Sequence, residues 1–373
     1  MSAKHGSSLF VRGRWWAAAV AAVMAAALAV PASAAGAATG AATGGSGAFT
    51  QTNLVSDVPG MAALTDPLVS NPWGISLGPT TPLWVTNNNT NTATLYQGAN
   101  GKQPISKVAL TVKLSPGPTG TVFNFRAASN PKDFVVGAKG KSTPSLFMFN
   151  SLAGNLIGWS LNLPPVTRSH NVQHVPGAVY TGLAEATTKQ GAGRLFAANA
   201  SMGTVDEFNA KFKQVASFGD PSLPKNVTPY NVALLGGKLY VTFAPPPGTS
   251  KGLQGAIDVF SLSGHMIRRL VTGGPLFAPW GMVIAPRPWG GFGGDLLVGN
   301  VDNGRINAFN PTTGKFQGTM RDKNGKAIVN SGLWGLAFGN GVIGTPRTLL
   351  FSAGIDEYSH GLVGLLRPAS RNS

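Results

Sequence analysis

The chain of 373 residues carries 29 lysines and arginines against 13 aspartates and glutamates, for a formal net charge of +16, and it contains no cysteine. Disulfides and thiolate-based metal or catalytic sites are therefore excluded. The basic residues are dispersed instead of forming a stripe among exposed aromatic residues, so we expect no nucleic-acid partner. Two interpretations of the charge remain: an ordinary solvated surface, or loose attraction to an anionic wall polymer, a glycan or a protein.

Residues 1–34 are typical of a secretory signal peptide. A basic stretch that ends at Arg14 precedes an apolar run at residues 15–30, and the small residues 32–34 follow. A membrane anchor is the alternative, but the apolar run is shorter than the roughly 20 residues that a spanning helix needs. We therefore expect a secreted protein, extracellular or in the cell envelope, without a transmembrane segment after the signal is removed.

Composition divides the rest of the chain into three parts. Residues 35–48 contain only alanine, glycine, threonine and serine, which predicts a flexible linker. Residues 367–373 form a short polar tail that we expect to be disordered. Between them, in residues 49–366, glycine and proline recur every few positions and separate short runs rich in β-forming residues. Long helices are excluded there, and an all-β fold is expected.

An aromatic residue followed by glycine and an apolar run recurs within this folded part. Residues 73–77, 280–284 and 334–338 begin the clearest copies, and each is followed by a second and a third β-rich run. Weaker copies lie between them. Together they make six copies with a period of about 50 residues, which is in the range of propeller blades. The copies are anchored at Trp73, Val122, Leu183, Tyr230, Trp280 and Trp334.

The repeat predicts a six-bladed β-propeller. A single four-stranded sheet cannot bury both of its faces, whereas sheets stacked around an axis bury both and expose only short outer edges. The glycine after the aromatic residue would let the backbones of the crowded inner strands approach closely. We expect residues 49–56 to form the outer strand of the last blade and thereby to close the ring. A β-sandwich is the alternative.

Several segments also resemble a known protein family. They span nearly the whole chain after the linker and comprise residues 53–57, 71–75, 83–87, 278–281, 294–300, 332–336 and 360–362. They resemble an uncharacterised family of conserved hypothetical exported β-propellers, known chiefly from bacterial genomes with the PEP-CTERM sorting system. The resemblance implies an NHL-like propeller. It implies no activity, because the function of that family is itself undetermined.

One face of a propeller collects the loops that lead into each inner strand and those that follow each second strand, and ligands usually bind at that mouth. The tryptophans there can serve as stacking platforms for a sugar ring, or they can be buried wedges between inner strands. The asparagines can supply neutral oxygen ligands, or they can simply form tight turns. The candidate ligand-binding residues are Trp73, Asn88, Tyr230, Trp280, Asn300 and Trp334.

Ionisable residues are scarce, so those near the mouth are the candidates for chemistry. Asp302, Asp356, Glu357 and His360 are the candidate catalytic residues, because a carboxylate and a histidine within reach can transfer protons. The alternative is that the acids pair with surface arginines and His360 binds a loop carbonyl. No cofactor and no metal site is predicted; a divalent cation, if bound, would use Asp302 and Asp356. Glu185 is an isolated carboxylate expected to point into the channel.

Three hypotheses of function follow. The first is a secreted binding module for a glycan, a cell-wall polymer or a protein, because acids are scarce and asparagine, glycine and tryptophan are plentiful. The alternative is a metal-assisted lactonase- or lyase-like enzyme with its site at the mouth, which needs at least two converging carboxylates or histidines. The third is a purely structural envelope protein without an ordered pocket. The sequence leaves open whether the protein is an enzyme, and we expect a monomer.

Overall fold

The computed structural model describes residues 47–246, 249 and 252–369. The predicted signal peptide, all but the last two residues of the predicted linker and the last four residues of the predicted tail lie outside this range. Every regular element of the described residues is a β-strand. In that part of the chain, no helix is long and apolar enough to cross a membrane.

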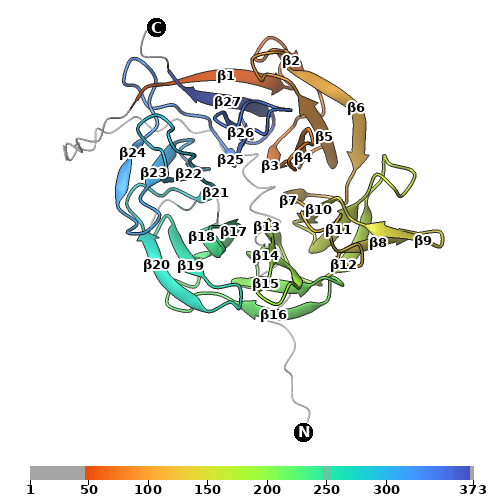
Figure 1. The fold of residues 1–373 in the computed structure, drawn as a ribbon. Helices are drawn as coiled ribbons and strands as arrows, with labels where there is room; N and C mark the ends of the chain where they lie inside the picture. The colour runs from red at the N-terminus through yellow and green to blue at the C-terminus, as the bar shows by residue number, and fades with distance from the viewer. Residues whose placement is uncertain (1–46, 247–248, 250–251, 370–373) are drawn as a thin grey trace.

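Six of the seven sheets that the described strands form are arranged radially around one axis (Figure 1), and we number them as blades 1–6. From the innermost strand outward, blade 1 contains β3 (Pro72–Ser76), β4 (Leu83–Asn87), β5 (Thr92–Gln97) and β6 (Ser106–Lys113); blade 2 contains β7 (Pro118–Phe123), β10 (Phe147–Ser151), β11 (Asn155–Trp159) and β12 (His170–His174); blade 3 contains β13 (Tyr180–Thr187), β14 (Gly193–Asn199), β15 (Thr204–Asn209) and β16 (Gln214–Phe218).

The second half of the ring has the same organisation. Blade 4 contains β17 (Thr228–Leu235), β18 (Lys238–Ala244), β19 (Ala256–Phe260) and β20 (Met266–Thr272); blade 5 contains β21 (Pro279–Ile284), β22 (Leu296–Asn300), β23 (Ile306–Phe309) and β24 (Phe316–Thr319); blade 6 contains β25 (Leu333–Phe338), β26 (Leu349–Ala353), β27 (Leu362–Pro368) and β1 (Phe49–Ser56), with β2 (Leu64–Thr65) at its edge.

The innermost strands make a closed ring around the axis. Each inner strand contacts the next one along the chain, and β25 of blade 6 contacts β3 of blade 1. Each also carries one of the anchors predicted from the repeat, namely Trp73, Val122, Leu183, Tyr230, Trp280 and Trp334. The prediction of a six-bladed β-propeller is therefore confirmed.

The N-terminal strand closes the ring, as predicted. β1 pairs antiparallel with β27, and the register runs from Phe49 opposite Pro368 to Ser56 opposite Leu362. The pairing therefore carries β27 two residues past the expected end of the propeller at residue 366. Because the last blade takes strands from both ends of the described chain, the first and last repeats are joined by backbone hydrogen bonds.

Glycines on the inner strands let neighbouring blades meet. A Cβ atom added to Gly74 would lie 2.5 Å from the carbonyl oxygen of Thr119 on blade 2. A Cβ atom on Gly335 would lie 2.7 Å from Cγ1 of Ile75 on blade 1. Both distances are far below van der Waals contact, so the predicted reason for glycine at these positions is confirmed.

The hydrophobic core lies between the blades. Between blades 1 and 2, the buried Trp84 stacks on Phe147 with ring centroids 4.2 Å apart and also packs against Trp159 at 4.5 Å. Comparable clusters fill the other interfaces. Burial of apolar surface on both faces of each sheet is the main stabilising contribution in this architecture, at roughly 25 cal/mol per Å².

One insertion interrupts the repeat and bears on the site. Blade 2 contains, between its first two strands, a hairpin of β8 (Val135–Ala138) and β9 (Lys141–Pro144) that projects from the ring (Figure 1). Phe134, just before the hairpin, is fully buried and packs against Phe212 of blade 3 with ring centroids 5.4 Å apart. This contact holds the inserted segment against blade 3, at the turn between β15 and β16.

Candidate functional site

Two cavities stand out in the described part of the chain, at opposite ends of the inner strands. The first, the axial channel, has a volume of about 640 Å³ and is lined by the second halves of all six inner strands. The second, the mouth pocket, has a volume of about 660 Å³ and is lined by loops that precede β21 and β25 and follow β22 and β26, together with Thr249 and Gln254 between β18 and β19. Three of the four predicted catalytic candidates belong to the mouth pocket.

A cluster of aromatic side chains lies between the two cavities, and we call it the aromatic plug. It consists of Trp73, Trp280, Trp334 and Tyr230, which are between 1% and 5% exposed. Trp73 and Trp334 stack with centroids 3.7 Å apart, and Trp280 meets Trp334 edge-on at 6.0 Å. Trp280 also lines the channel. On the other side, Tyr358 lines the mouth pocket and packs against Trp334 at 5.7 Å.

The burial and mutual packing of these rings agree with the interpretation of the tryptophans as wedges between inner strands. The indole nitrogens of two of them are used within the fold: Nε1 of Trp334 donates to Oδ1 of Asn71 at 3.0 Å, and Nε1 of Trp280 donates to the carbonyl oxygen of Thr181 at 2.9 Å. Because the rings cover one another, their faces are occupied by protein.

The two asparagines that were candidate ligand-binding residues form hydrogen bonds within the fold. Nδ2 of Asn88 donates to the carbonyl oxygen of Pro118 at 3.0 Å, and Nδ2 of Asn300 donates to that of Pro275 at 2.8 Å. Both side chains are buried, with Asn300 fully so. Their amides fix the loops at this end of the propeller, which agrees with the turn-forming interpretation.

The mouth pocket gathers three of the four predicted catalytic residues. Asp302, Asp356 and Glu357 all line it. Asp356, Glu357 and Tyr358 are consecutive residues in the left-handed backbone region, with φ of 49°, 54° and 67°. Desolvation raises the pKa of Asp302, although part of that residue reaches solvent.

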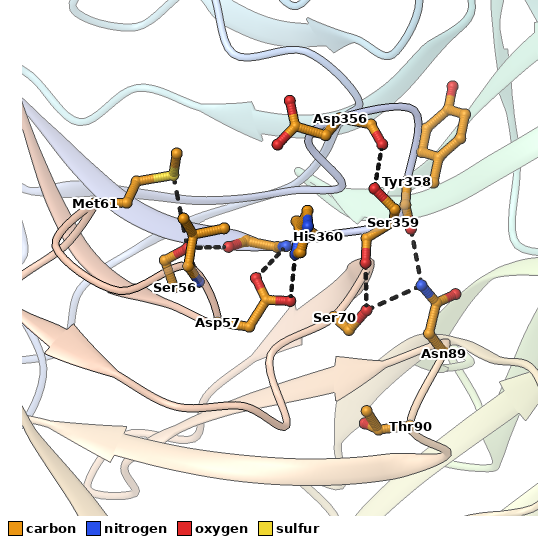
Figure 2. Close-up of polar contacts among 12 residues, drawn as sticks. Ser56, Asp57, Met61, Ser70, Asn89, Thr90, Asp356, Tyr358, Ser359 and His360 are labelled. Atoms are coloured by element: carbon orange, nitrogen blue, oxygen red, sulfur yellow. Dashed lines mark hydrogen bonds and ion pairs between the residues drawn. The ribbon is translucent and has the colours of Figure 1, made fainter.

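His360 does not join these acids. Figure 2 shows its ring facing Asp57, with Nδ1 2.9 Å from the carboxylate Oδ2, and this hydrogen bond raises the pKa of the imidazole. The backbone N–H of Gly361 donates to the other oxygen of Asp57 at 2.9 Å. Asp57 follows the closing strand and lies 303 residues away in the chain. No local motif indicated this pairing.

The mouth does not form a metal cluster in the part of the chain that the structure describes. There, no three histidine, cysteine or acidic side chains are placed to hold a metal ion. Asp302 and Asp356 alone would leave most of the coordination sphere of a divalent cation to water, since such ions take six or more oxygen ligands. The absence of a cofactor therefore stays a prediction.

The axial channel is mainly apolar and contains Glu185, as predicted. Its walls are largely aliphatic and aromatic, and Glu185 on β13 is the one ionisable side chain among the described residues that line it. Oε1 of this carboxylate is buried without a hydrogen-bond partner. Burial raises the pKa of Glu185 to about 7. A hydrogen bond with the backbone of Phe125 and the positive charge of Arg126 lower this pKa, but by less.

Arg126 stands beside Glu185 but is engaged elsewhere. Its Nε donates to Oδ2 of Asp133 at 2.7 Å, and Nη1 donates to Oγ1 of Thr187 at 3.0 Å. Nη2 donates to the carbonyl oxygen of Gly191 at 2.7 Å. Asp133 lies in the insertion of blade 2, so the insertion supplies both the arginine and the carboxylate that neutralises it.

A second unsatisfied polar atom lies in the same channel. Thr121 on β7 lines the cavity and is only 7% exposed, and its Oγ1 has no hydrogen-bond partner. Sequence reasoning identified neither Thr121 nor Arg126 nor Asp133, because none of them belongs to a motif. Buried polar groups are almost always hydrogen-bonded, so these two unpaired oxygens, both on residues that line the channel, are exceptions in the described part of the chain.

Comparison with known proteins places the chain among viral relatives. It is 30% identical over 332 residues to the uncharacterized protein R648 of Acanthamoeba polyphaga mimivirus, which covers 83% of this chain and 78% of that protein. It is also 30% identical over 338 residues to the uncharacterized protein L690 of the same virus, covering 84% of each. The chain belongs to the family of these two proteins.

This family carries no stated activity, and no family model matches the chain. Its viral members do not support the bacterial PEP-CTERM context implied by the sequence resemblance. The export predicted from residues 1–34 rests on the sequence alone.

Solved structures of other proteins show a partial likeness to the chain. A virginiamycin B lyase from Staphylococcus aureus matches with a TM-score of 0.47 at 12% identity, covering 86% of this chain and 99% of that one. An α-L-arabinofuranosidase from Fusarium graminearum matches with a TM-score of 0.50 at 10% identity, covering 86% and 98%. At 10% identity the likeness to the arabinofuranosidase concerns the fold alone and transfers no activity.

Proposed function

We propose that this propeller is a binding module that holds a small molecule in its axial channel. The supporting observation is the channel itself: a cavity of about 640 Å³ with largely apolar walls and one carboxylate, on Glu185, whose Oε1 is buried without a hydrogen-bond partner. Small-molecule sites typically have volumes of roughly 300–1,000 Å³, apolar walls and a few polar groups that orient the ligand.

Binding is better supported than catalysis. Acid–base catalysis usually needs two groups with different proton affinities in reach of the same substrate. Among the described residues that line the channel, Glu185 has no such partner, since Arg126 is engaged with Asp133. At the mouth, His360 pairs with Asp57 and leaves the three acids without a histidine. The lactonase- or lyase-like alternative would need a metal there in addition.

From the sequence, a glycan or polymer ligand is expected at the mouth of the propeller, which is a different surface from the channel. The indole faces expected to stack on sugars are covered within the aromatic plug. The plug also blocks the path of an extended polymer along the axis. These features favour a small ligand in the channel over a polymer at the mouth, in a protein that we propose to be secreted.

A channel-filling substitution tests this function. Ser76 is a half-buried residue that lines the channel, so the indole of Ser76→Trp should occupy the cavity. Ligands that bind only the folded state raise its melting temperature. We expect compounds from a small-molecule library to raise the melting temperature of the full chain and to lose this effect with Ser76→Trp.

Ser263→Trp is the matched control, because Ser263 is exposed in the turn between β19 and β20, away from the channel. It should respond to the same compounds as the wild type. If no compound stabilises the wild type, or if the compounds stabilise Ser76→Trp equally well, the proposed function is wrong.

A further inference from the structure

We propose that the ligand of the channel is a compact organic ammonium ion, with its apolar body among the channel walls and its charged nitrogen on the carboxylate of Glu185. This inference rests on the binding function proposed above and names its ligand class. It is argued from the charges, the unpaired acceptors and the shape of the channel.

Charge balance favours a cation. The charged groups that face Glu185 are Arg126, from the loop after β7, and Asp133, from the segment before β8. Arg126 and Asp133 form an ion pair that is largely buried, so their charges compensate each other. The lining residues from β3, β17, β21 and β25 are uncharged. An ionised Glu185 therefore leaves one unbalanced negative charge in an apolar cavity, which one ammonium group would neutralise.

The unpaired atoms favour a hydrogen-bond donor. Oε1 of Glu185 and Oγ1 of Thr121 are both buried without partners, and both can accept a hydrogen bond. An ammonium group has up to three N–H donors and no acceptor. Hydrogen bonds between an ammonium and a carboxylate are about twice as strong as neutral ones, so a cationic donor suits Glu185 better than an alcohol or an amide.

The shape of the channel favours a compact ligand. At one end of the cavity Trp280 of the aromatic plug forms part of the lining, and Trp73 and Trp334 pack against Trp280. The opposite end is open beside Phe125, which is 65% exposed. A site that is closed at one end accepts a molecule of limited length, and its apolar walls favour an aromatic or aliphatic body.

The experiment compares benzylamine with benzyl alcohol, two probes of nearly the same shape that differ in charge. Binding to the purified full chain is measured by calorimetry at pH 8, where Glu185 is mostly ionised. We expect benzylamine to bind at least about tenfold more tightly than the alcohol, as expected for a charge-assisted hydrogen bond. Glu185→Gln should remove this preference, because the isosteric amide carries no charge.

Acidification supplies a second readout. Because the pKa of Glu185 lies near 7, only a few per cent of the carboxyl groups are ionised at pH 5.5. The apparent affinity scales with that fraction, so benzylamine should bind about 30-fold more weakly at pH 5.5 than at pH 8. Benzylamine itself stays protonated over this range, and benzyl alcohol should show no such loss.

Glu357→Gln controls for the acidic mouth pocket and should leave benzylamine binding unchanged. The ammonium proposal would be overturned if benzyl alcohol bound as tightly as benzylamine or more tightly, or if benzylamine bound more tightly at pH 5.5 than at pH 8. The channel would then be a site for neutral ligands. Benzylamine binding that survives Ser76→Trp and is lost with Glu357→Gln would place the site at the mouth and overturn the channel function as well. If neither probe binds, the ammonium proposal fails, and the library experiment with Ser76→Trp decides the channel function separately.

Discussion

At the scale of single residues, Glu185 has the most unusual environment in the channel. Its side chain is half-buried on an inner strand, with Oε1 fully buried, and it receives no compensating ion pair because Arg126 is held by Asp133. Burial disfavours the charged form and raises the pKa of Glu185 from 4.5 to about 7. The native state therefore keeps a proton that the unfolded chain has already released.

This difference makes stability depend on pH. The protonated carboxyl stabilises the fold fully below pH 4.5, and the contribution is lost as the pH rises toward 7. Glu185→Gln should therefore raise the free energy of unfolding at pH 8 by about 2 kcal/mol, after a reduction for partial solvent access, and change it little at pH 4. Urea unfolding at both pH values measures this.

The control is Glu357→Gln, which changes the same chemical group at an exposed position. It should alter stability by less than about 0.5 kcal/mol at either pH. An effect of Glu185→Gln of the same size at pH 4 and pH 8 would mean that the carboxylate is not destabilised by its site.

Residue-level prediction from the sequence was weakest where partners are distant. Asp302, Asp356 and Glu357 were expected at the mouth from the spacing of loops after second strands, and they line one pocket there. His360 was grouped with them because it is close in sequence. Its partner is Asp57 on the closing segment, and only ring closure brings the two together.

At the scale of elements, the inner strands depend on glycine. Gly74 on β3 faces the backbone of β7, and an added Cβ atom would lie 2.5 Å from the carbonyl oxygen of Thr119 and 2.9 Å from the backbone nitrogen of Thr121. Since neither is the end of a flexible side chain, relief requires the two blades to separate. We expect Gly74→Ala to lower the free energy of unfolding by about 2–3 kcal/mol.

Gly47→Ala is the matched control, because a Cβ atom there would meet its neighbours at 3.7 Å or more. It should change stability by less than about 0.5 kcal/mol. Denaturant unfolding followed by tryptophan fluorescence compares the two variants. A neutral Gly74→Ala would show that the inner ring can expand without loss.

Local patterns predicted the strands of the repeat better than the insertion. The aromatic-glycine signature and the following β-rich runs are short-range features, so they could be recognised directly. The β8–β9 hairpin has no counterpart in the other blades. The segment between β7 and this hairpin supplies Arg126 and Asp133 near the channel and contacts blade 3, and no periodicity indicates such contacts.

At the scale of the whole molecule, the ring depends on its closure by β1. Phe49 at the start of this strand is 1% exposed and packs on Trp289 and Phe292 of blade 5, with centroids 4.9 and 5.9 Å away. Truncating a buried phenylalanine leaves a cavity. We expect Phe49→Ala to lower the free energy of unfolding by about 3–5 kcal/mol.

Phe316→Ala provides the comparison, since Phe316 lies on the outer strand β24 and is 39% exposed. Its loss should cost about 1 kcal/mol or less. Urea unfolding of both variants checks the difference. Equal effects would indicate that the closing strand contributes no more than an ordinary surface contact.

The sequence by itself determined the architecture: a repeat of about 50 residues, six blades, glycines on the inner strands and a closing N-terminal strand. Each of these follows from local patterning or from the need to bury both faces of every sheet. Only the tertiary structure decided which side chains share a cavity. Glu185 meets Arg126 and lines the same channel as Thr121 because three segments from two blades converge on the axis, and that proximity depends on blade packing instead of sequence spacing.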